Sequence, residues 1–267
     1  MINTLKKFHP TRLIPAIQRR LAEKKFLKLW NNSNKGKENK EYLKTLKDIH
    51  KGERLFLIAN GPSIKDMDLG VLKNEFTMCM NRFYIYFDKI GFVPNYLVCV
   101  EDLVLGQFAE DFNNIPIEGK FVNWRFHQQI NKCHYLKEAF AFNPFFQNDI
   151  TNPTHFGGTV TFACLQLAYY MGFSEIIIIG MDHSFKEKGI PNKIEVRKYE
   201  KDESHFDPNY FPKGMKWKLP DLDKSEIGYL IARNFYESNN RKIIDATING
   251  KCEIFDKQDF SSINLKK

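Results

Sequence analysis

Four short apolar runs in this sequence each end in polar residues that could bind a ligand: Asn60, Asn81, the pair Glu101 and Asp102, and Asp182. Amide and carboxylate groups can hold ribose hydroxyls, phosphate oxygens, a nucleobase or a metal ion. The carboxyl ends of parallel strands share one edge of a sheet, where open α/β sheets bind ligands. We therefore expect these residues to form one site, although each asparagine alone is also typical of an ordinary turn.

The first of these breaks is the loop Asn60-Gly61-Pro62-Ser63, which follows the apolar residues 55–58. Gly61 is free to take a positive φ and could let a ligand approach the backbone closely. Ser63 could cap a following helix whose N–H groups bind a phosphate. An ordinary strand-turn-helix without a ligand is the alternative interpretation of the same residues.

A second glycine-rich segment, Gly157-Gly158-Thr159, precedes an apolar stretch that is predicted as a helix over 159–171. Two glycines and a hydroxyl at a helix N-terminus indicate an anion site. The segment lacks the Gly-Lys-Ser/Thr of a Walker A loop. The alternative is that the glycines only allow the helix to pack closely.

His205 is the residue that we predict as a general base, because an unperturbed imidazole titrates near neutral pH and aromatic residues surround it in the sequence. His155 and His183 are alternatives, and each of the three could be an ordinary surface histidine. No Gly-x-Ser-x-Gly occurs, which argues against covalent hydrolysis. Glu101, Asp102 and Asp182 could hold a magnesium ion, but there is no Asp-x-Asp or His/Cys cluster, so Mg is possible rather than required.

These residues need a scaffold of alternating strands and helices. Apolar runs predict strands at 54–60, 76–81, 95–101, 120–125, 138–143, 175–181 and 242–246, with a possible short one at 252–255. Helices are predicted at 66–73, 159–171 and 222–239. The alternation is typical of a doubly wound, mainly parallel α/β sheet of the Rossmann-like kind. The long connection 182–221 contains His205 and several aromatic residues, which indicates a lid over a ligand.

Charge separates the first fifty residues from the rest. Residues 1–51 hold 14 of the 40 Lys and Arg but only 4 of the 32 Asp and Glu, so the remainder is close to neutral. We predict a basic N-terminal extension, 1–50, and a catalytic domain, 51–267. Residues 12–30 could lie on an anionic membrane or pack on their own domain, and 31–41 resemble a linker. A near-neutral body argues against nucleic-acid binding.

The five cysteines are scattered singly, and three lie in apolar segments, which favours buried thiols in a reducing compartment. No apolar run is long enough to span a bilayer, and the N-terminus does not resemble a secretory signal. We expect a cytoplasmic protein that can associate peripherally with the inner membrane and can form a homo-oligomer.

Three segments in their order resemble two related protein families: Ile58–Ser63, Met80–Tyr84 and Gly172–Asp182. They are similar to bacterial CMP-sialic acid-dependent sialyltransferases with one Rossmann-like domain. They also resemble the MptE-like family, named for a 6-hydroxymethylpterin diphosphokinase, as does the segment Asp245–Gly250. The resemblance covers about residues 54–256.

The sialyltransferase resemblance implies that the loop after the first strand and the asparagine after the second bind CMP. It implies donor contacts from the segment before the long helix, and a lid that supplies a histidine base and a tyrosine at the donor phosphate. In this chain the base is His205 and the tyrosine is Tyr210. Together with the residues at strand ends, the predicted nucleotide-binding set is Asn60, Gly61, Pro62, Ser63, Asn81, Asp102, Gly158, Thr159 and Asp182.

The resemblance implies a glycosyltransferase that uses a CMP-activated sugar of the sialic acid or nonulosonate type, with a glycan or glycolipid acceptor in bacterial surface glycan synthesis. The alternative is an MptE-like pyrophosphokinase that uses ATP and Mg, with Glu101, Asp102 and Asp182 as metal ligands. A third possibility is a non-catalytic nucleotide-binding module at the membrane.

Overall fold

The computed structural model describes residues 10–198 and 201–266. The chain divides into two compact units, residues 1–42 and 43–267. The first contains helix α2 (Pro10–Asn32) and most of helix α3 (Asn34–Thr45). The proposed extension over 1–50 and catalytic domain over 51–267 stay a prediction. Within the part that the structure describes, no helix is both long and apolar enough to cross a membrane.

The prediction of a linker over 31–41 is wrong, because α3 occupies most of that range. Ser33 immediately precedes this helix, and its hydroxyl accepts the N–H of Gly36 at 3.1 Å. Such a cap satisfies one of the N–H groups that a helix start leaves open. The lysines and glutamates that follow have good helix propensity. The linker was predicted from the low apolar content alone, which does not exclude a helix.

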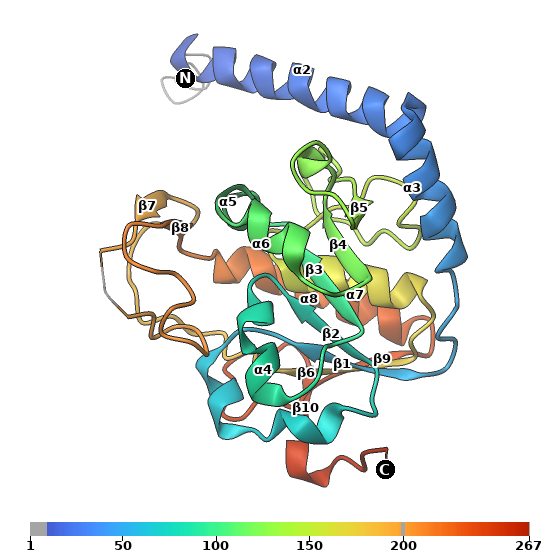
Figure 1. Cartoon of the computed structure of the whole chain (residues 1–267), viewed down its shortest axis with the longest axis vertical. Coiled ribbons are helices and arrows are strands. Elements are labelled where there is room, and N and C mark those ends of the chain that lie inside the picture. The colour runs from blue at the N-terminus through green and yellow to red at the C-terminus, as the bar shows by residue number, and fades with distance from the viewer. Residues whose placement is uncertain (1–9, 199–200, 267) are drawn as a thin grey trace, which may run out of the picture. The chain divides into compact units, whose positions relative to one another are not determined.

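The larger unit is built on an eight-stranded sheet in which every neighbouring pair is parallel (Figure 1). The predicted doubly wound α/β fold is confirmed. In spatial order the strands are β10 (Asp256–Lys257), β9 (Lys242–Asp245), β6 (Glu175–Ile179), β1 (Arg54–Ile58), β2 (Thr77–Met80), β3 (Tyr96–Cys99), β4 (Gly119–Asn123) and β5 (His134–Leu136).

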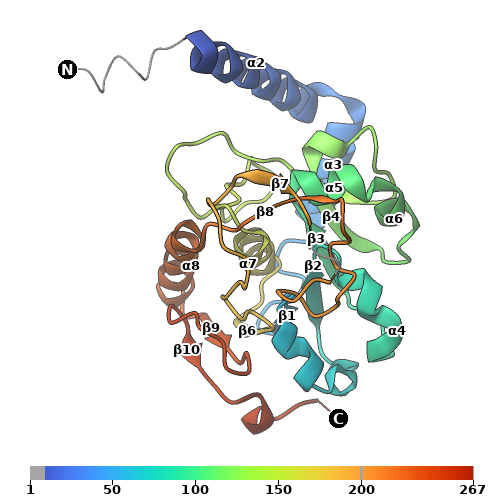
Figure 2. The ribbon, with the colours of Figure 1, turned by 90° about the vertical axis from the view of Figure 1, so that its left-hand side faces the viewer.

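The central strands are buried on both faces, which explains their unbroken apolar sequences. Leu55–Ile58 of β1 and Ile176–Ile179 of β6 are all buried. Figure 2 shows α7 (Val160–Tyr170) and α8 (Leu222–Glu237) on one side of the sheet and α4 (Phe87–Ile90) on the other. Helices on both faces leave the strand ends as the place where polar groups can gather.

Several predicted elements differ from the structure. Residues 138–143 form no strand; the edge strand β5 lies just before them, and Phe142 is fully exposed. Residues 66–73 form short 3-10 turns (Pro62–Asp66 and Leu69–Leu72) in place of a helix. The last strand is Asp256–Lys257 and not 252–255. The sequence analysis also missed α5 (Asp102–Gln107) and α6 (Ala109–Asn114), which are too short to show helical periodicity.

The long connection between Asp182 and Asp221 contains a small two-stranded antiparallel sheet of its own. Its strands are β7 (Ile194–Val196) and β8 (Lys216–Lys218), which lie apart from the main sheet in Figure 1. The role of this segment as a lid stays a prediction.

Candidate functional site

The site lies where the strand order reverses. β1 lies between β2 and β6, and Ile58 is level with Cys79 on one side and with Ile179 on the other. After β1, the strands β2 to β5 are added one after another on one side of β1. The chain then crosses back, and β6 pairs with the other side of β1. A reversal of this kind opens a crevice outside the carboxyl ends of the strands in doubly wound sheets. Asn60 and Asp182 follow the two strands that flank it.

Asp182 binds the loop after β1 directly. Its carboxylate accepts the Ser63 N–H at 3.1 Å and the Ser63 hydroxyl at 2.6 Å. The Ser63 hydroxyl therefore fixes the loop to the end of β6 and does not cap a helix, and its N–H already has a partner. Pro62 begins the short 3-10 turn at that point.

Gly61 has a different role from the expected one. Its φ is −70°, so it does not use the left-handed region. A Cβ at this position would lie 1.8 Å from Asp182 Oδ2 and 2.6 Å from the Gly180 carbonyl oxygen. Glycine is therefore required because β1 and β6 approach closely at their ends, and not because of the backbone angle.

The side-chain oxygens of Asn60 and Asn81 are buried and have no hydrogen-bond partner within the described residues. Asn60 is 8% exposed, and Asn81 holds a positive φ of 51° at the end of β2. A buried acceptor without a partner costs about 1–3 kcal/mol, so a ligand that donates hydrogen bonds would recover that energy. Ribose hydroxyls and a base amino group are such donors, whereas phosphate oxygens are not.

His205 is held by a buried carboxylate. Its Nδ1 lies 2.9 Å from Asp202 Oδ2, and its ring stacks on Tyr210 with ring centroids 4.1 Å apart. Burial raises the pKa of Asp202, but the hydrogen bond and charge of His205 and the charge of Arg197 outweigh it and lower the pKa overall. An ionised Asp202 fixes the proton on Nδ1 and leaves Nε2 as an acceptor. The arrangement suits a general base.

Main-chain hydrogen bonds attach this histidine segment to the sheet edge. The Phe206 N–H donates to the Asn60 carbonyl at 3.0 Å. The Arg82 guanidinium donates to the carbonyls of Asn209 and Tyr210, and packs over the Phe108 ring at 3.7 Å. His205 is thereby tied to the loop of Asn60 and to the residue that follows Asn81.

Tyr210 contacts the Arg82 main chain and the His205 ring, and its predicted contact with the donor phosphate stays a prediction. Its side chain is 1% exposed, and its hydroxyl lies 3.4 Å from the Arg82 N–H. Burial raises the pKa of Tyr210. The observed role of this residue is to support the His205 ring.

The Gly157-Gly158-Thr159 segment adopts the backbone that its glycines allow, with φ of 63° and 82° at the two glycines. Thr159 precedes α7 without a side-chain cap and lies 3.3 Å from the Tyr229 hydroxyl. A Cβ at Gly158 would lie 3.1 Å from Lys224 Cδ. Burial, followed by the charge of Lys224, lowers the pKa of His155 behind the glycines. The helix start and Lys224 together could hold an anion.

Three useful residues escaped the sequence analysis: Asp202, Arg82 and Lys224. Asp202 and His205 differ by three positions, a spacing that could have suggested the pair. Lys224 is close to Gly158 only because α8 packs beside α7, which no local pattern shows. Arg82 follows the predicted Asn81, but the carbonyls that it binds, those of Asn209 and Tyr210, lie more than a hundred residues away in the sequence.

The carboxylates that were proposed as metal ligands are engaged elsewhere. Glu101 pairs with Lys218 at 3.1 Å, and Asp102 pairs with Arg125 at 3.1 Å and accepts from Asn123. Among the described residues, no group of three or more His, Cys, Asp or Glu side chains could hold a metal ion. The donor set therefore does not fit a magnesium cluster of Glu101, Asp102 and Asp182.

The segment Asp245–Gly250 closes the site beside β6. The Thr247 hydroxyl accepts the Met181 N–H at 3.0 Å, and the Lys251 N–H donates to the Asp182 carbonyl at 3.0 Å. These bonds fix the position of Asp182 from the side opposite to Ser63.

The fold and the site define a doubly wound α/β protein with polar side chains gathered at its topological switch point. Comparison with family models gives the family: the model described as 6-hydroxymethylpterin diphosphokinase MptE-like matches residues 28–188. The chain belongs to this MptE-like family. The match covers β1 to β6 and ends before His205. No curated protein sequence matches the chain significantly.

Proposed function

We propose that this protein transfers a sugar from a CMP-activated donor of the sialic acid or nonulosonate type to an acceptor hydroxyl. Membership of the MptE-like family is consistent with a transferase that acts on a nucleotide substrate. The observation that carries the proposal is the Asp202–His205 pair, held beside Asn60 by the Phe206–Asn60 bond. In this proposal the pair supplies a general base beside the predicted nucleotide site.

In the proposed reaction His205 Nε2 takes the proton of the acceptor hydroxyl. The acceptor oxygen then forms a bond to the anomeric carbon of the sugar. The bond from that carbon to the phosphate oxygen breaks, and CMP leaves with the electron pair. Asp202 stabilises the imidazolium that forms on His205.

The donor would lie between the two asparagines and the start of α7. The buried oxygens of Asn60 and Asn81 would accept hydrogen bonds from the ribose hydroxyls or from the base amino group. Lys224 and the N–H groups at the start of α7 would stabilise the charge that develops on the leaving phosphate. CMP leaves as a nucleoside monophosphate, so the developing negative charge lies on one phosphate group.

A second candidate is diphosphate transfer from ATP to a hydroxymethyl group, which the family match favours. His205 could equally deprotonate that hydroxyl. Glu101 and Asp102 already pair with Lys218 and Arg125, and Asp182 accepts the Ser63 hydroxyl, so we place this reaction second.

Calorimetric titration of the full chain with CMP and with ATP, each with and without magnesium, tests the proposal. We expect CMP to bind without magnesium and ATP to bind more weakly. Binding of ATP that requires magnesium, with no binding of CMP, would contradict the proposal and favour the pyrophosphokinase. CMP binding without turnover of any CMP-sugar would favour a non-catalytic module.

A further inference from the structure

The two-stranded sheet of β7 and β8 presents an unusual face to solvent. Ile194 is opposite Lys218, and Val196 is opposite Lys216. Cross-strand partners point to the same side of a sheet, so these four side chains share one face, which we name the hairpin face. Ile194 is 58% exposed and Val196 is 54% exposed. The hairpin face therefore exposes two β-branched apolar side chains, Ile194 and Val196, beside two lysines.

The hairpin face is held in place by the body of the protein. Gln107 of α5 exchanges two hydrogen bonds with the Lys216 backbone, at 2.7 and 2.8 Å. Lys218 pairs with Glu101 at the end of β3. A two-stranded hairpin is marginally stable alone in water, so these contacts fix both its structure and its position beside the strand ends.

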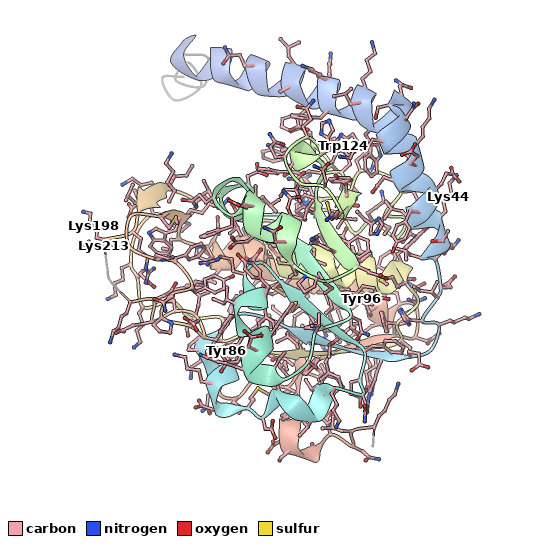
Figure 3. The ribbon with its side chains drawn as sticks, viewed as in Figure 1. Lys44, Tyr86, Tyr96, Trp124, Lys198 and Lys213 are labelled. Carbon is pink, nitrogen blue, oxygen red and sulfur yellow. The ribbon has the colours of Figure 1, made fainter. Side chains whose placement is uncertain are left out.

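The lysines around this face carry more charge than their neighbours neutralise. Among the described residues, Lys188, Lys198 and Lys216 are exposed and have no carboxylate partner, whereas Lys193 pairs with Glu195. Ile190, 66% exposed, adds a third apolar side chain nearby in the sequence. Figure 3 shows Lys198 and Lys213 at the outer end of this part of the chain.

A partner for this face must be apolar where it meets the isoleucine and valine, and anionic where it meets the lysines. The interface of an anionic bilayer combines both properties. A single-stranded nucleic acid would instead call for exposed aromatic side chains that stack on bases, and the phosphate backbone of a duplex offers no apolar surface to the isoleucine and valine. The aromatic side chain of β8, Trp217, alternates to the opposite face, where Arg197 packs over its ring.

We propose that the hairpin face, formed by Ile194, Val196, Lys216 and Lys218, docks on an anionic lipid bilayer. The hairpin belongs to the same segment, 182–221, as His205. If the proposed glycosyl transfer is correct, docking would bring an acceptor carried by a membrane lipid toward the general base. Docking itself does not depend on that reaction.

Sedimentation of the full chain with lipid vesicles tests this proposal. We expect binding to phosphatidylcholine vesicles that contain phosphatidylglycerol, and little binding to phosphatidylcholine alone. The triple variant Ile194→Thr/Val196→Thr/Lys216→Gln should lower the partition coefficient at least about tenfold, because one surface lysine alone accounts for about fivefold. Threonine keeps the β-branched shape, so the hairpin should persist.

The matched control is Val71→Thr/Lys73→Gln, which changes an exposed valine and lysine on the short turn after β1. It should bind as the wild type does. Lys216→Glu alone, which keeps both apolar side chains, should also weaken binding.

Wild-type partition of the triple variant would overturn the proposal and assign any binding to another part of the chain. Absence of vesicle binding by the wild type would overturn it as well. A dimer in solution that the triple variant dissociates would identify the face as a contact between two copies. Titration with CMP in the absence of vesicles tests the proposed function alone. Its result does not depend on vesicle binding, so the failure of one proposal can be distinguished from the failure of the other.

Discussion

At the scale of single residues, the central feature is the contrast between His205 and the two asparagines. His205 already has a partner, Asp202, which orients it. Asn60 and Asn81 each have a buried side-chain oxygen with no hydrogen-bond partner among the residues that the structure describes. In the proposed function, His205 moves a proton, and the two asparagines accept hydrogen bonds from the nucleotide. The following two predictions separate these roles.

Asp202→Asn should lower kcat by about 10²–10⁴-fold, because an amide cannot stabilise the imidazolium and no longer fixes the His205 tautomer. His205→Gln should lower it similarly, and CMP affinity should change little in either variant. Glu203→Gln is the matched control, because Glu203 is exposed and its ion pair is with the exposed Lys186 at the surface. Steady-state kinetics with titration of CMP distinguish the effects. Full activity in Asp202→Asn would remove His205 as the base.

Asn81→Gly should weaken CMP binding by about tenfold, the effect of one lost hydrogen bond to a buried group. Glycine retains the positive φ of this position, so the fold should be unaffected. Asn240→Gly is a control with a matched backbone, since Asn240 has a φ of 56° after α8. Calorimetry measures both. Equal affinities in the two variants would show that the Asn81 amide does not contact the nucleotide.

At the scale of elements, the ends of β1 and β6 are packed against each other without space for a side chain at Gly61. Gly61→Ala should destabilise the fold by about 1–3 kcal/mol, because the new Cβ must displace Asp182 and the Gly180 carbonyl. Displacing Asp182 also breaks its bonds to Ser63, so nucleotide binding should weaken in parallel.

Gly189→Ala is the control for that prediction. Its Cβ would meet no atom within 4 Å, so its stability should match or slightly exceed that of the wild type. Chemical denaturation of both variants gives the comparison. A Gly61→Ala protein as stable as wild type would mean that the two strand ends can separate freely.

The elements that sequence patterns predicted well are those whose environment is uniform along their length. After a charged first residue, β1 and β6 are apolar because both faces of the sheet are covered, so both strands could be predicted directly from the sequence. Residues 138–143 contain the apolar run Ala139–Phe142, yet Phe142 is fully exposed, so this run does not mark a buried strand. The β7–β8 hairpin carries three residues a strand, too few for any period to appear.

For the site, the sequence predicted which strand ends come together but not which side chains bind each other there. Parallel strands bring their ends together, so the contact between the Asn60–Ser63 loop and Asp182 follows from the pattern. The hydrogen bonds of Asp182 to Ser63 and of His205 to Asp202 could not be predicted, because each of these side chains has several potential partners in the sequence. The hydrogen bonds that form depend on the path of the whole 182–221 segment, which no local pattern describes.

At the scale of the whole molecule, burial lowers the pKa of three histidines: His50, His134 and His155. In His134 of β5 the pKa falls to about 4. Between this value and the unfolded value near 6.5, the unfolded chain binds more protons than the folded protein. Stability is therefore complete above about pH 6.5 and decreases as the pH falls toward 4.

His134 alone should account for a loss of about 2 kcal/mol at about pH 5. Denaturant unfolding across this pH range measures it, and His134→Gln should flatten the dependence. A stability that is constant from neutral pH to about pH 5 would show that these histidines are not held neutral in the folded protein.

The account as a whole depends on a sugar transferred from CMP with His205 as the base. The most direct test is release of CMP from CMP-N-acetylneuraminic acid by the full chain in the presence of a metal chelator. We predict that the wild type releases CMP and that Asp202→Asn is slower by at least about a hundredfold. No release of CMP, together with magnesium-dependent formation of AMP from ATP, would contradict the account.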